Sequence, residues 1–157
     1  MAIRGWVLGL GLAGLLAAPL PHAFAQAPKT TVTIGMDVDA GSLDPRKARD
    51  TTAYRTIDLI YDGLVQITPD LKAVPNLAAS WENPEPTVWI FKLRDGVQFH
   101  DGKPVTAEDV AYTFNSILDP ATAAPFRALL TPIKTIDVVD ARTIKFTLSA
   151  PYAPLLS

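Results

Sequence analysis

The sequence predicts an α+β fold in which two helices pack on a small, mostly antiparallel sheet. Two stretches, within residues 50–64 and 106–118, repeat apolar residues at helical spacing. Two others, residues 88–99 and 133–148, are apolar, β-branched runs that turn back at Asp, Gly or Arg, as hairpins do. The chain has 157 residues, enough for one modest core.

The first 25 residues resemble a cleaved secretory signal. Arg4 precedes an apolar stretch over residues 5–19, and Ala23-Phe24-Ala25 places small residues where a signal peptidase recognises them. The alternative is a membrane anchor, but the apolar stretch is shorter than the roughly 20 residues that span a bilayer. We therefore expect export and cleavage after Ala25. The chain has no cysteine, which excludes a lipid-modified N-terminal Cys and disulfides.

Strand, loop and helix are predicted next. Residues 30–36 alternate with Val32 and Ile34 on one face, which predicts a strand, and a polar loop follows it. A helix is predicted to begin at Asp50 and to end near Gly63. This prediction rests on the helical spacing of the apolar residues Tyr54, Ile57, Ile60, Tyr61 and Leu64.

Short extended pieces follow this helix. Residues 65–68 and the segment that begins at Val74 flank a turn at Pro69-Asp70. Trp81 should then anchor the side of the small sheet by ordinary core packing.

The stretch from residue 88 to residue 118 organises the chain as strand, turn, strand, turn and helix. Val88 to Leu93 reads as a strand, and Asp95-Gly96 can form the tight turn of a hairpin whose second strand is Val97 to Phe99. His100-Asp101-Gly102 makes a second turn, an exposed one whose side chains bond to local backbone.

A helix follows, with Thr106 as its N-cap. The Thr106 hydroxyl can accept a hydrogen bond from the Asp109 N–H. Glu108 and Asp109 favour the positive end of the helix dipole. The apolar stripe comprises Val110, Ala111, Phe114, Ile117 and Leu118, and Asp119-Pro120 ends the helix.

The last part of the chain is predicted to be a loop and a hairpin. Residues 121–132 form the loop, with Phe126 near its middle. Residues 133–139 and 143–148 are the two strands, and alternation in the second predicts one buried face.

Several function classes are disfavoured by the composition. The net charge is −2 and no basic stripe is present, which disfavours nucleic-acid binding. After the leader His100 is the only histidine, a poor start for a metal site. A Ser80, His100 and Asp101 triad is disfavoured, because adjacent His and Asp in a glycine turn do not easily reach triad geometry. No catalytic residue, metal or cofactor is therefore expected.

The run Phe-x-Leu-Arg-x-Gly-Val-x-Phe-His-Asp-Gly-x-Pro-Val-Thr-Ala-Glu-Asp-Val, from Phe91 to Val110, resembles a motif of one family. This is the peptide and nickel group of ABC-transporter solute-binding proteins, extracellular solute-binding protein family 5. Further matches are Leu43-Asp44-Pro45, Ile60-Tyr61-Asp62-Gly63-Leu64-Val65, Pro75-Asn76-Leu77-Ala78-Ala79-Ser80-Trp81, Phe146-Thr147-Leu148 and Pro151-Tyr152-Ala153-Pro154. Residues 83–87 depart from the family, many members of which have an Asp-Gly turn there.

The resemblance implies part of a two-lobed α/β periplasmic-binding-protein fold of type II. Residues 1–25 would be the signal peptide, residues 26–48 the first strand and loop of the large ligand-binding lobe, and residues 49–157 the accessory subdomain. Members of the family are considerably longer, so we expect an N-terminal fragment or a truncated reading frame, which would bind ligand weakly alone.

The resemblance also implies where ligand would bind. In the family, the segment before the first helix pairs its backbone with an extended peptide, as an added strand does, and this segment corresponds to Arg49, Asp50 and Thr51. An aromatic residue from the loop after the second helix corresponds to Phe126. The alternative is that Asp50 merely caps the helix and Phe126 fills the subdomain core.

The implied function is a periplasmic, monomeric protein that delivers oligopeptides or dipeptides to an ABC permease and has no chemistry of its own. Lobe closure around ligand would present both lobes to the permease. A nickel or metallophore binder of the same family is the first alternative. An exported hydrolase and a non-functional remnant are the others.

Overall fold

The computed structural model describes residues 31–156. Of these, residues 36–156 belong to one compact unit. The predicted signal peptide, with its cleavage after Ala25, lies outside the described residues. Among the residues that are described, no helix is long and apolar enough to cross a membrane.

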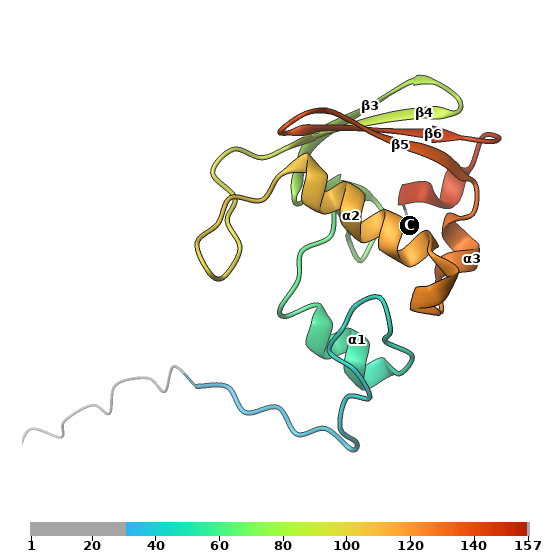
Figure 1. Ribbon diagram of the computed structural model, residues 1–157. Helices are drawn as coiled ribbons and strands as arrows, with labels where there is room; N and C mark the ends of the chain where they lie inside the picture. Colours follow the sequence, from blue (N-terminus) through green and yellow to red (C-terminus); the bar gives the residue numbers. More distant parts are fainter. Residues whose placement is uncertain (1–30, 157) are drawn as a thin grey trace, which may run out of the picture. The chain divides into compact units, whose positions relative to one another are not determined.

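A four-stranded antiparallel sheet forms the centre of this unit (Figure 1). Its strands lie in the order β3 (Ala78–Glu85), β4 (Val88–Leu93), β6 (Thr143–Leu148) and β5 (Ile133–Asp140). β4 pairs with β3 on one side and with β6 on the other, with Phe91 opposite Ile144. The predicted strand at 88–93 and the hairpin at 133–148 are therefore confirmed.

The return strand predicted at Val97 to Phe99 is wrong, because β3 and β6 occupy both edges of β4. The segment instead pairs across the next turn: the Phe99 N–H donates to the Lys103 carbonyl at 2.8 Å, and the Val105 N–H donates to the Val97 carbonyl at 3.0 Å. Gly96 and Gly102 have φ of +70° and +85°, so the glycines are needed at both turns.

Helix α2 (Ala107–Leu118) crosses one face of the sheet (Figure 1) and has the predicted bounds. Thr106 is its N-cap and forms a capping box with Asp109. The Thr106 N–H and hydroxyl both donate to Asp109 Oδ2 at 2.9 Å. Because Val110 and Ala111 are buried, the predicted apolar stripe is the face that packs.

The core lies between α2 and the sheet. Phe146 is 1% exposed, and its ring meets Phe91 and Phe114 edge-on at centroid distances of 5.6 and 5.0 Å. Trp81 lies 6.5 Å from Phe91, which confirms its packing on the sheet. An apolar cavity of about 230 Å³ remains beside these rings, bordered also by the one-turn helix η2 (Ala153–Leu156).

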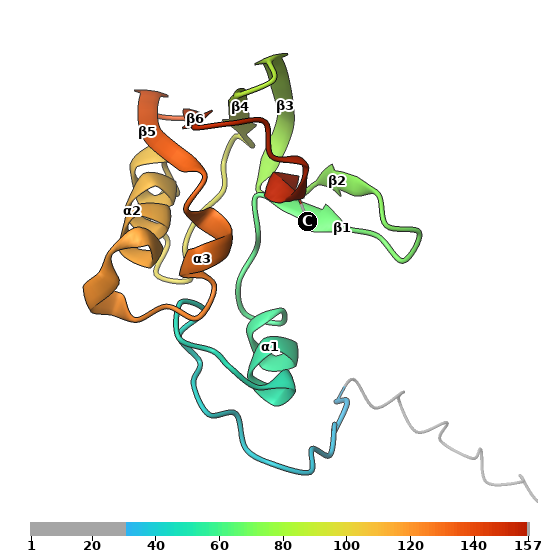
Figure 2. The same cartoon turned by 90° about the vertical axis from the view of Figure 1, so that its right-hand side faces the viewer.

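A second, two-stranded sheet consists of β1 (Val65–Ile67) and β2 (Ala73–Pro75), which are antiparallel (Figure 2). The turn between them contains Pro69-Asp70, as predicted, and Leu71 there has φ +60°. The Ala78 N–H donates to the Leu64 carbonyl at 2.9 Å, which joins the start of β3 to the segment before β1.

The strand predicted at residues 30–36 is not formed in the described part, residues 31–36. A strand needs a neighbour for its backbone hydrogen bonds, and no described segment pairs with this one. Val32 is 82% exposed, so its alternating apolar face is not buried either.

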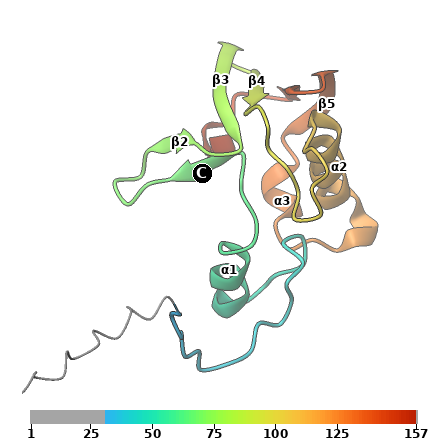
Figure 3. The ribbon, with the colours of Figure 1, turned by 90° about the vertical axis from the view of Figure 1, so that its left-hand side faces the viewer.

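Helix α1 (Thr51–Ile57) is the short helix labelled in Figure 3. It ends six residues before Gly63, earlier than predicted. Its last turn tightens, with the Leu59 N–H donating to the Thr56 carbonyl at 3.2 Å. Leu59 is 73% exposed, and Ile60 and Tyr61 are also exposed. The apolar residues continue at helical spacing past Ile57, but they are not buried. The helix therefore gains no packing there, and it ends at Ile57.

The predicted loop at residues 121–132 contains two short helical turns, η1 (Pro120–Thr122) and α3 (Arg127–Leu130). Asp119 caps the first of them by accepting from the Ala121 N–H at 2.9 Å. The segment between α2 and β5 is therefore more ordered than its sequence indicated.

Candidate functional site

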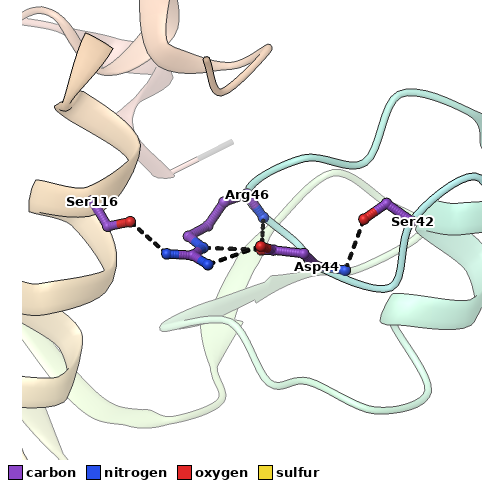
Figure 4. Close-up of polar contacts among 4 residues, drawn as sticks. All are labelled: Ser42, Asp44, Arg46 and Ser116. Atoms are coloured by element: carbon purple, nitrogen blue, oxygen red, sulfur yellow. Dashed lines mark hydrogen bonds and ion pairs between the residues drawn. The ribbon is translucent and has the colours of Figure 1, made fainter. Parts of the chain in front are cut away.

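A polar network joins the segment before α1 to helix α2 (Figure 4). The guanidinium of Arg46 donates to Asp44 through Nε at 3.0 Å and Nη2 at 2.8 Å, and its Nη1 donates to Ser116 Oγ at 2.7 Å. Ser42 Oγ accepts from the Asp44 N–H at 3.1 Å. The side-chain hydrogen bonds from Arg46 lower the pKa of Asp44, although desolvation opposes this.

Asp50 caps helix α1. Its Oδ1 accepts from the Ala53 N–H at 2.7 Å, and its Oδ2 accepts from the Gly41 N–H at 3.1 Å. A Cβ at Gly41 would lie 2.8 Å from Asp50 Oδ2, so a larger residue there would force this carboxylate to shift. The side chain of Asp50 is therefore engaged within the chain, as the capping interpretation expected.

Arg49 and Phe126 are brought to the same place. Arg49 Nη2 donates to the Ala123 carbonyl at 3.1 Å. The ring of Phe126 packs against that of Tyr54 in α1, with centroids 5.6 Å apart and planes tilted by 50°. Phe126 is 42% exposed. It does not fill the subdomain core, and that alternative is wrong.

Tyr54 and the loop of Phe126 are each fixed independently. The Tyr54 hydroxyl donates to the Ala48 carbonyl at 2.8 Å. On the loop side, Arg127 Nε donates to the Leu118 carbonyl at the end of α2 at 2.7 Å. The aromatic pair thus sits between two anchored segments.

The backbone before α1 has unused hydrogen-bonding groups. Asp50 is extended, with φ −122° and ψ 156°. Among the described residues, no partner is found for the N–H groups of Arg49, Asp50 and Thr51, or for the Arg49 carbonyl. The side chains of Arg49 and Thr51 are exposed. These donors and this acceptor are therefore unpaired within the described part of the chain.

Sequence reasoning did not find Arg46, Tyr54 or Ser116 as members of this region. Arg46 directly follows the Leu43-Asp44-Pro45 motif, and this position was its only signal. Tyr54 was assigned to the apolar face of a helix. Ser116 lies 70 residues from Arg46, and nothing local to either residue indicates the contact.

Metal-binding side chains are not clustered in the described residues. No group of three or more His, Cys, Asp or Glu residues lies close enough there to hold an ion. His100 is exposed, at the turn where Asp101 Oδ1 accepts from the Lys103 N–H at 3.1 Å.

Comparisons with known proteins converge on one group. The probable D,D-dipeptide-binding periplasmic protein DdpA of Escherichia coli is 37% identical over 92% of this chain and 29% of its own length. The nickel-binding periplasmic protein of E. coli is 30% identical over 92% of the chain and 28% of its own length. This chain therefore spans less than a third of the curated relatives it matches.

A solved structure shares the fold. The murein tripeptide binding protein MppA of E. coli superposes with a TM-score of 0.69 and 32% identity, covering 73% of this chain and 26% of that one. The sheet, its helices and the α+β arrangement thus correspond to part of a periplasmic-binding-protein fold. Residues 72–157 match the family model described as bacterial extracellular solute-binding proteins, family 5 Middle. The chain belongs to this family of bacterial extracellular solute-binding proteins.

Proposed function

We propose that this protein is the periplasmic solute-binding component of an ABC importer, which binds dipeptides or oligopeptides and delivers them to a membrane permease. It acts as a monomer by enclosing its ligand, without a catalytic step. The observation that carries the peptide assignment is the run of unpaired backbone groups at Arg49, Asp50 and Thr51, together with the exposed ring of Phe126, which packs on Tyr54 of the helix that follows them.

A peptide suits these groups because its own backbone supplies both donors and acceptors at regular intervals. Because Asp50 is extended, the backbone groups of Arg49 and Thr51 point to one side and those of Asp50 to the other. An extended peptide can pair with the edge formed by Arg49 and Thr51 as an added strand, which gives affinity that depends little on the peptide's sequence. The ring of Phe126, which packs on Tyr54 of the following helix, offers an exposed apolar surface. Together they define a ligand class by its backbone.

Nickel or a metallophore is the second candidate, and the E. coli nickel-binding relative favours it. A bare metal ion, however, requires several ligating side chains around it. The described residues contain no such cluster, so the region at residues 49–51 favours the peptide.

Thr51→Pro tests the added-strand model. Thr51 is the first residue of α1, where proline is favoured, and Asp50 before it already has the extended backbone that proline requires. The substitution therefore removes one N–H donor with little expected loss of stability. Thr51→Ala removes the same side chain and keeps the donor, which makes it the matched control.

Binding of a mixed library of di- to pentapeptides to the full-length protein should be followed by calorimetry. We expect Thr51→Pro to weaken binding about three- to tenfold, the value of one hydrogen bond, and Thr51→Ala to leave it unchanged. Equal binding by all three proteins would refute pairing at this position. Binding of Ni²⁺ but no peptide by the wild type would transfer the assignment to the second candidate.

Export is proposed with cleavage between Ala25 and Gln26. N-terminal sequencing of the protein from a periplasmic extract should begin at Gln26. Recovery of the uncleaved chain in the membrane fraction would contradict this proposal.

A further inference from the structure

Two arginine side chains connect the segment before α1 to elements more than 60 residues away. Arg46 reaches Ser116 on α2, and Arg49 reaches the carbonyl of Ala123 in the loop after η1. The two arginines have different partners: Arg46 also forms an ion pair with Asp44, whereas the side chain of Arg49 donates its hydrogen bond to Ala123. Arg49 therefore interacts with the loop that carries Phe126, and Arg46 with the helix before it.

The loop has a conformation that benefits from an external contact. Ala123 has φ +51° and ψ 36°, the left-handed region that an alanine rarely adopts. Its carbonyl is the acceptor for Arg49, and its N–H donates to the Pro120 carbonyl at 3.1 Å. Three residues later comes Phe126, whose ring contact is with Tyr54.

Arg49 and Tyr54 approach this loop from the same short segment, residues 48–54. Tyr54 is tied to the Ala48 carbonyl, one residue before Arg49. The guanidinium and the Tyr54 ring therefore hold the loop at two points three residues apart, Ala123 and Phe126. If the Arg49 guanidinium is removed, the contact between the Phe126 and Tyr54 rings is the one of these two that remains.

We propose that Arg49 is a positioning residue. Its side chain holds the Ala123 carbonyl and thereby keeps the Phe126 ring packed on Tyr54. The side chain does not itself contact the solute. The proposal rests on the proposed function in so far as Phe126 contacts a bound solute. It assigns the backbone of Arg49 to ligand pairing and its side chain to the loop.

Fluorine NMR tests the position of the ring without any ligand. The full-length protein would be labelled with 4-fluorophenylalanine, and the Phe126 resonance assigned from its loss in Phe126→Leu. We expect Arg49→Ala to shift or broaden this resonance and Arg49→Lys, which keeps a charged donor, to restore most of it. Arg55→Ala is the matched control, because Arg55 is an exposed arginine on α1 with no hydrogen bond to the loop of Phe126 among the described residues.

Affinity for trialanine, measured in parallel, tests the coupling. We expect Arg49→Ala and Phe126→Ala each to weaken binding about fivefold, and the double variant to bind no more weakly than Phe126→Ala, because Arg49 acts through that ring. A Phe126 resonance unmoved in Arg49→Ala, or additive losses in the double variant, would overturn the proposal. If the wild type binds no peptide, the proposed function fails, whereas the fluorine spectra still decide the role of Arg49.

Discussion

The sheet region and the segment around α1 are stabilised in different ways. Between α2 and the four strands, large side chains such as Phe146 and Ile144 are almost fully buried. The small apolar cluster at α1 consists of the buried residues Ala48, Ala53 and Ile57. Around it, polar contacts made by Asp44, Arg46 and Asp50 fix the backbone. Apolar burial thus dominates in one region, and hydrogen bonds in the other.

This difference separates stability from binding. Regions with few buried apolar contacts open locally at a lower free energy than the core does. The candidate ligand-binding backbone at residues 49–51 belongs to the weakly buried region, while its partner ring at Phe126 is anchored to α2 through Arg127. Substitutions in the two regions should therefore affect different observables.

Phe146→Ala should have the largest effect. The change removes a ring that is 1% exposed and contacts two other rings, so the free energy of unfolding should fall by about 3–5 kcal/mol. Urea denaturation measures it. Phe99→Ala is the control, since Phe99 is 45% exposed, and its cost should be within about 0.5 kcal/mol.

Thr106→Ala should have a smaller effect in the same region. It removes the hydroxyl that bonds to Asp109 at the start of α2 and should cost about 1 kcal/mol. Thr106→Ser keeps the hydroxyl and should melt close to the wild type. An unchanged melting temperature in both variants would show that Thr106 does not stabilise the helix start.

Asp50→Ala should leave the overall unfolding midpoint nearly unchanged and loosen only the segment around α1. The loss of its bonds to the N–H groups of Gly41 and Ala53 should speed hydrogen exchange of those amides about fivefold, which corresponds to about 1 kcal/mol. Asp50→Asn keeps one acceptor oxygen, so it should preserve the bond to one of the two N–H groups and speed exchange only at the other. A fall in the global midpoint comparable with that of Thr106→Ala would contradict the separation of the two regions.

Acidification should weaken the contact between Asp44 and Arg46. Hydrogen bonds from Arg46 lower the pKa of Asp44 below its usual 3.8. The contribution of this ion pair to the free energy of unfolding is therefore fully present above the ordinary pKa of an aspartate. It is lost as the pH falls through the lowered pKa of Asp44 in the folded protein. Carboxyl NMR of Asp44 should show the low pKa, and Arg46→Gln should return it towards 3.8. An Asp44 pKa at or above 3.8 in the wild type would contradict this.

The sequence predicted the elements that are specified by local pattern. Strand 88–93 is an apolar run followed by turn residues, and helix 107–118 has helical periodicity and capping residues at its start. Residues 31–36 alternate as well, but alternation specifies only a face, and a strand also needs a partner. The strand predicted at Val97 to Phe99 does not form because β4, its expected partner, pairs with β6 instead. β6 lies about 50 residues further along the chain, so no local pattern indicates this competition.

The candidate site depended on the resemblance more than on local pattern. No periodicity or spacing indicates Arg49, Asp50, Thr51 or Phe126, and their role in ligand binding stays a prediction. The structure adds that they lie together. One contact that brings them together is the hydrogen bond from Arg49 to Ala123. These residues are 74 positions apart, so a local sequence pattern cannot predict the contact.

The pairing of β4 with β6 has a consequence for the order of folding. β4 is an inner strand, and Val88 pairs with Thr147, 59 residues later. A nascent chain that has emerged only as far as α2 can form the β3–β4 hairpin and the helix, but it leaves one side of β4 unpaired and the ring of Phe91 without its contact with Phe146. Such an unpaired strand edge is prone to aggregation. The sheet can close only after Thr147 has emerged, so long-range pairing is expected to make its folding slower than that of the neighbouring helix.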